Sequence, residues 1–130
     1  MSATRSVLIV EDNDRTSELL SLLFSTEGYE SERLADGAAA LERLDGAPPA
    51  LVVLDVMMPR ASGIDVLQAI RSHPDWADTP VIVTSARSAD QEIWEGWRAG
   101  ADYYLVKPYK LDELWARAGE LLRTGELGAG

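Results

Sequence analysis

The sequence predicts a single α/β domain built on a doubly wound, five-stranded parallel sheet. Short apolar runs rich in Val and Ile alternate with stretches of helical spacing, which is the pattern of repeated βα units. The chain has 130 residues, the usual size of one domain with one hydrophobic core. Because crossovers between parallel strands are right-handed, helices are expected on both faces of the sheet.

The expected strands differ in how apolar they are. The first is a continuous run of Val, Leu and Ile, as in a strand buried on both faces, whereas the second alternates weakly and indicates an edge strand. The strands are expected at Ser6–Val10, Tyr29–Leu34, Ala50–Leu54, Val81–Val83 and Tyr103–Val106.

Apolar residues at three- and four-residue spacing predict five helices. Gly28 ends the first, because glycine adopts the left-handed cap conformation at least cost, and Pro48 and Pro49 end the second. Ser88 and Gln91 have the spacing of a capping box ahead of the fourth. The helices are expected at about 15–27, 38–44, 64–73, 89–99 and 111–122.

Composition excludes several classes of function. Twelve Lys and Arg against 22 Asp and Glu give a net charge of -10, so direct binding to nucleic acid or to a membrane surface is not expected. The absence of Cys excludes disulfides and thiolate metal sites. No membrane helix or secretory signal is recognisable, so we expect a cytoplasmic protein. The folded domain is expected over residues 1–123, followed by a flexible Gly-rich tail over 124–130.

Polar side chains follow four of the five predicted strands. They are Glu11 and Asp12, Asp55, Thr84 and Lys107. If the first strand neighbours the third, three carboxylates converge and repel one another in a partly desolvated cleft. The sequence therefore predicts a divalent cation, and oxygen ligands without His or Cys favour Mg²⁺.

This set of groups suits the transfer of a phosphoryl group to a carboxylate. Asp55 is the predicted nucleophile, because it stands at the end of the central buried strand. The metal and Lys107 would neutralise the phosphoryl oxygens, and Thr84 would donate a hydrogen bond to one of them.

From about residue 6 to residue 123 the sequence resembles the receiver domain of two-component response regulators. The matching segments are Leu8–Asp12, Leu54–Pro59, Gly63, Val83–Ala86 and Tyr104–Pro108. The resemblance implies the flavodoxin-like strand order 2-1-3-4-5. It also implies that Asp55 accepts phosphate from a sensor histidine kinase or a phosphotransfer protein.

The resemblance assigns further roles within the site. Asp12 would bind the metal directly, Glu11 mainly through water, and the main-chain carbonyl of Met57 would complete the protein ligands. Thr84 and Tyr104 resemble the family's switch pair. Lys107 resembles its phosphate-contacting lysine, with a cis bond to the following proline.

A partner surface is expected on the fourth helix, fifth strand and fifth helix. Trp94 and Trp97 share a face of the fourth helix, and tryptophan is enriched at interfaces. We expect this face, with Tyr104, to contact a second copy of the chain or an output domain. The family's DNA-binding branch usually carries two acids before the switch aromatic, but here Tyr103 follows Asp102. The resemblance therefore does not predict the salt-bridged dimer of that branch.

Two alternatives belong to other classes. A Mg²⁺-dependent phosphatase of the haloacid-dehalogenase type also uses a strand-end aspartate, but it needs a second acid two residues later, where this chain has Met57. A scaffold that keeps the fold without phosphorylation would not need all of the functional positions filled. We therefore expect a switch that catalyses only its own phosphorylation and dephosphorylation, not an enzyme.

Overall fold

The computed structural model describes residues 5–56, 63–86 and 97–129, with the backbone only from residue 123 onward. Within these ranges the chain forms one parallel sheet in the order β2-β1-β3-β4-β5, which confirms the predicted architecture and strand order. The strands are β1 (Ser6–Val10), β2 (Glu30–Leu34), β3 (Leu51–Asp55), β4 (Val81–Ser85) and β5 (Tyr103–Val106).

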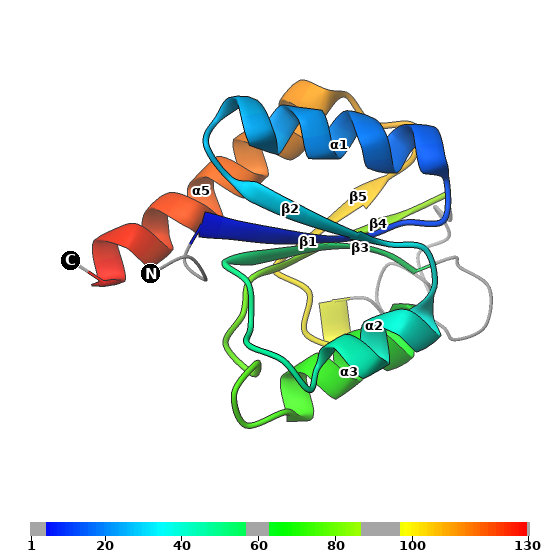
Figure 1. Ribbon diagram of the computed structural model, residues 1–130, viewed down its shortest axis with the longest axis vertical. Helices are drawn as coiled ribbons and strands as arrows, with labels where there is room; N and C mark the ends of the chain where they lie inside the picture. Colours follow the sequence, from blue (N-terminus) through cyan, green and yellow to red (C-terminus); the bar gives the residue numbers. More distant parts are fainter. Residues whose placement is uncertain (1–4, 57–62, 87–96, 130) are drawn as a thin grey trace.

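Helices cover both faces of the sheet (Figure 1). One face carries α1 (Asp14–Thr26) and α5 (Leu111–Ala129), and the other carries α2 (Gly37–Arg43) and α3 (Gly63–Ser72). The helix expected over 89–99 falls largely on residues 87–96, which lie outside the described residues. No helix in the described ranges is both long and apolar enough to cross a bilayer.

The last helix is longer than the sequence predicted. Its backbone remains helical to Ala129, so the expected end near Arg123 is wrong. Gly125 and Gly128 each cost about 1 kcal/mol relative to alanine. That cost does not end a helix whose earlier turns are fixed by packing of Leu114 and Ala118 in the core. The flexibility of the tail stays a prediction.

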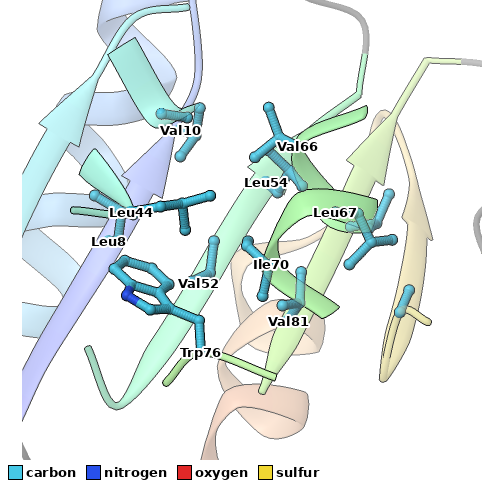
Figure 2. Close-up of a cluster of buried hydrophobic side chains, with 13 residues drawn as sticks. Leu8, Val10, Leu44, Val52, Leu54, Val66, Leu67, Ile70, Trp76 and Val81 are labelled. Atoms are coloured by element: carbon cyan, nitrogen blue, oxygen red, sulfur yellow. The ribbon is translucent and has the colours of Figure 1, made fainter. Parts of the chain in front are cut away.

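Strand residues alternate between two apolar layers, one on each side of the sheet. Val7 and Ile9 of β1 pack in the layer that contains Leu20 of α1 and Leu114 of α5. Their neighbours on β1 pack in the other layer, with Trp76 at one end (Figure 2). Because β1, β3 and β4 are buried on both faces, the polar chemistry at the centre of the sheet lies where these strands end.

Candidate functional site

The ends of β1 and β3 bring the acidic side chains together. Val10 of β1 pairs with Leu54 of β3, so Glu11 and Asp55 follow at neighbouring positions. One carboxylate oxygen from each of Glu11, Asp12 and Asp55 lies within 4.8 Å of the other two. Glu11 and Asp55 are buried and Asp12 is exposed. Like charges so close repel one another, so this cluster favours a bound cation.

Lys107 supplies one positive charge from the end of β5. Its Nζ donates to Glu11 Oε1 at 2.9 Å and to Asp55 Oδ2 at 3.2 Å. The backbone holds the lysine in place, because its N–H donates to the Ser85 carbonyl at 2.7 Å. The bond to Pro108 is cis, as the resemblance implied. A single ammonium therefore joins two buried carboxylates that come from different strands.

The protonation of these groups follows from burial and charge. Burial raises the pKa of Glu11, and the charge of Asp55 adds to this, although hydrogen bonds from Lys107 and the Asn13 N–H oppose it. Burial alone would lower the pKa of Lys107, but its bond to Glu11 and the charge of Asp55 outweigh burial and raise it. Lys107 is therefore an ammonium at neutral pH, and among the described residues it is the one cation that pairs with this cluster, through Glu11 and Asp55.

The carboxylate oxygens fit a hard divalent ion such as Mg²⁺. Both oxygens of Glu11 already have partners, Oε1 in Lys107 and Oε2 in the Asn13 N–H at 3.0 Å. Asp12 is exposed and has no hydrogen-bond partner among the residues that the structure describes. The contacts of Glu11 are thus compatible with a water-mediated role, and those of Asp12 with direct ligation, while Asp55 is the third carboxylate of the cluster. Met57, the remaining predicted ligand, lies outside the described residues.

The two predicted switch residues lie on neighbouring strands. Thr84 is buried on β4 and pairs with Asp55 of β3 in the register. Tyr104 is half-buried on β5, where its ring packs against the apolar layer that contains Trp76. Trp97 of the expected partner surface is exposed, and Trp94 lies outside the described residues.

Gly63 allows α3 to begin directly against the end of β3. A Cβ atom at this position would lie 2.3 Å from the Val56 Cα and 2.7 Å from the Asp55 carbonyl oxygen. Both neighbours are backbone atoms, so neither can move aside without displacing the strand that carries Asp55. Glycine is therefore required here by close approach.

Two features near the site were not predicted from the sequence. Arg33 of β2 contacts the first turn of α1, immediately after the acidic residues. The hydroxyl of Tyr109 is buried and has no hydrogen-bond partner among the described residues. Burial raises the pKa of Tyr109, and the charges of Lys107, Glu11 and Asp55 also act on it. No sequence pattern indicates the contact of Arg33 with α1, since that contact depends on the pairing of β2 with β1.

The comparisons with known proteins agree with this geometry. The sequence matches the response regulator receiver domain family over residues 7–118. Response regulator MprA of Mycolicibacterium vanbaalenii is 44% identical over 126 residues, which are 95% of this chain and 54% of MprA. The chain thus spans about half the length of the curated relatives it matches.

Solved receiver domains have the same fold. That of the Francisella response regulator 1452 is 30% identical, with a TM-score of 0.85 over 93% of this chain and 98% of that chain. The BeF3-activated receiver domain of DrrB is 29% identical, with a TM-score of 0.82 over 91% of this chain and 97% of that chain. The chain therefore belongs to the response regulator receiver domain family, which is not a conventional enzyme family, and it is a phosphoryl-accepting signalling switch.

Proposed function

We propose that Asp55 accepts the phosphoryl group in a Mg²⁺-dependent reaction. The observation that carries this assignment is the contact of the Lys107 ammonium with both Asp55 and Glu11, at 3.2 and 2.9 Å. Asp55 ends the central strand of the sheet and lies beside the other two carboxylates. Of the three acids, Asp55 is the one on the strand that pairs with β4, where it lies opposite Thr84.

The transfer exchanges one bond to phosphorus for another. A carboxylate oxygen of Asp55 attacks the phosphorus, and the bond from phosphorus to the donor breaks, with its electron pair leaving on the donor. Lys107 then donates to a phosphoryl oxygen, and the Thr84 hydroxyl donates to another. Asp12, Asp55 and the main-chain carbonyl of Met57 would hold Mg²⁺ directly. Glu11 would contact the ion through water. When bound, the ion neutralises the carboxylates and the phosphoryl oxygens.

The aspartyl phosphate would act by shifting a conformational equilibrium. As Thr84 moves toward the phosphoryl group, the Tyr104 ring turns further into the space beside β4, and the partner surface around Trp94 and Trp97 changes. We propose that this surface controls a second copy of the chain or an output domain. The phosphoryl donor would be a sensor histidine kinase or a phosphotransfer protein.

Acetyl phosphate with Mg²⁺ tests the acceptor. Intact-mass measurement should show one added phosphoryl group on the wild-type domain and none on Asp55→Asn. Asp45→Asn is the matched control, since it removes an exposed carboxylate that is not part of the acidic cluster and should be labelled like the wild type. Labelling of Asp55→Asn at the wild-type rate would refute the assignment.

The two alternatives have their own measurements. A phosphatase would hydrolyse a generic aryl phosphate with turnover, and no such turnover is expected because Met57 occupies the position of the required acid. A scaffold would show no calorimetric Mg²⁺ site that depends on Asp12 and Asp55. A Mg²⁺ site lost in both Asp12→Asn and Asp55→Asn would exclude the scaffold.

A further inference from the structure

Arg33 ties the edge strand β2 to the first turn of α1. Its Nε donates to Ser17 Oγ at 2.9 Å, and its Nη2 donates to Asp14 Oδ1 at 2.7 Å and to the Asp14 carbonyl at 3.3 Å. Ser17 is buried, so the guanidinium reaches into the junction between strand and helix. Three hydrogen bonds from one planar group restrict both the position and the orientation of this turn.

The turn that Arg33 holds is continuous with the acidic residues of the site. The Glu11 N–H donates to the Leu34 carbonyl of β2 at 2.9 Å, which fixes one end of the segment 11–14. Asn13 caps α1, because its Oδ1 accepts from the Thr16 N–H at 3.0 Å. Arg33 fixes the other end through Asp14. Strand β2 therefore holds this segment on both sides of Asp12.

Asp12 depends on this backbone support for its position. Its carboxylate is exposed and has no hydrogen-bond partner among the described residues, yet one of its oxygens lies within 4.8 Å of oxygens of Glu11 and Asp55. Because no partner in the described part of the chain holds this carboxylate, its place near the other two depends on the backbone that carries it. A fixed backbone also means that less conformational entropy is lost when a ligand binds.

We propose that Arg33 is a positioning residue for the divalent-cation site, which it acts on by fixing the segment that carries Asp12. It touches neither the ion nor the reacting atoms. This inference rests on the proposed function, because it assumes that the three carboxylates bind Mg²⁺.

The sign of the effect separates positioning from simple electrostatics. The guanidinium is a positive charge close to an acidic cluster, and Asp14 becomes an unpaired negative charge when it is removed. On charge alone, Arg33→Gln should therefore bind Mg²⁺ more tightly than the wild type. Positioning predicts weaker binding, and about 0.15 M salt reduces the charge effect because the screening length is then about 8 Å.

Calorimetric Mg²⁺ titration of four variants tests the proposal. Arg33→Gln should weaken binding about tenfold, as for other residues that orient metal ligands. Arg33→Lys keeps the charge without the planar fork and should bind at an intermediate strength. Ser17→Ala removes one anchor without changing the charge and should also weaken binding. Arg43→Gln is the control, because it loses the same charge from a residue that pairs with Glu32 of β2, and its Mg²⁺ affinity should equal that of the wild type.

Amide hydrogen exchange gives a second readout that does not depend on Mg²⁺. In Arg33→Gln the Asn13 N–H, which donates to Glu11, should exchange faster than in the wild type, while amides in the centre of β3 stay protected. If Arg33→Gln fails to fold, Arg33→Lys and Ser17→Ala carry the same test.

The outcomes distinguish the inference from the proposed function. A wild-type domain without a Mg²⁺ site that depends on Asp12 and Asp55 would overturn the proposed function, and with it this inference. A wild-type domain that binds Mg²⁺, with Arg33→Gln or Ser17→Ala binding as tightly or more tightly, would overturn the role of Arg33 alone.

Discussion

The side of the sheet where the strands begin, here called the amino edge, differs from the side where they end, the carboxyl edge. At the amino edge Arg71 donates to the carbonyls of Gly100, Ala77 and Thr79 at 2.6–3.1 Å and pairs with Asp102 at 3.0 Å. At the carboxyl edge two buried carboxylates share one ammonium, that of Lys107. One edge thus satisfies its charged group with several fixed partners, whereas the other concentrates negative charge. We therefore expect the first edge to contribute mainly to stability and the second to hold the cation of the proposed function.

The amino edge should therefore control stability without affecting the site. Trp76 is fully buried there, and its Nε1 donates to the Gly46 carbonyl at 3.0 Å. Trp76→Ala should lower the free energy of unfolding by about 3–5 kcal/mol, from lost packing and the cavity left behind. Urea unfolding measures this loss. Calorimetry on the folded fraction should show unchanged Mg²⁺ affinity.

The exposed Trp97 offers the matched control for that substitution. Trp97→Ala should change the unfolding free energy by less than about 0.5 kcal/mol, as surface substitutions usually do. A large loss of Mg²⁺ affinity in Trp76→Ala would contradict the separation of the two edges.

At the carboxyl edge, Lys107→Met should leave Glu11 and Asp55 buried without their common cation. Breaking a fully buried pair costs about 3–5 kcal/mol, and we expect about 2 kcal/mol here because the Lys107 side chain is 26% exposed. Saturating Mg²⁺ should restore much of the loss, since it binds only the folded state. Urea unfolding at pH 7 with and without Mg²⁺ measures both effects.

Lowering the pH should reduce the cost of Lys107→Met. Burial already raises the pKa of Glu11 in the folded state above its ordinary value of 4.5, and the variant loses the lysine bond that opposes this. A carboxyl with a raised folded-state pKa is penalised while it is ionised. The penalty falls as the pH drops through that raised value toward 4.5. A stability difference between variant and wild type that grows from pH 7 to pH 5 would contradict this account.

A smaller effect than that of Lys107→Met is expected from the Tyr109 hydroxyl, which lies beside the same edge. Tyr109→Phe removes a buried polar atom that has no partner among the described residues, so it should raise the free energy of unfolding by up to about 1 kcal/mol. Tyr103→Phe is the comparison, because the Tyr103 hydroxyl donates to Glu120. It should lower stability instead. Thermal unfolding of both variants checks the opposite signs, and a destabilised Tyr109→Phe would show that the hydroxyl has a partner.

The sequence predicted the position of the acidic cluster because strand ends determine it. Glu11 and Asp55 each follow an apolar run, and parallel strands place such residues at one edge. The sequence could not show that one ammonium contacts both, nor that Arg33 reaches α1. These contacts depend on side-chain reach and on the pairing of Ile9 with Arg33 between β1 and β2.

Asp102 is another residue whose contacts could not be predicted from the sequence. The sequence shows that a second acid is missing after it, but not what the remaining acid does. In the structure its Oδ2 accepts from the Val81 N–H at 2.8 Å and from Arg71. The Asp102 carboxylate therefore has its hydrogen-bond and ion-pair partners within its own domain. The final helix was predicted from Leu111, but its continuation beyond residue 122 was not, because glycine usually weakens a helix.

The exposed edge of β2 has a consequence for assembly. Glu30, Glu32 and Arg33 are all exposed on this outermost strand. Charged residues on an outer strand discourage another polypeptide from extending the sheet by backbone pairing, which is a common route to aggregation. Strand β2 is therefore not expected to be the surface through which copies of this domain would associate.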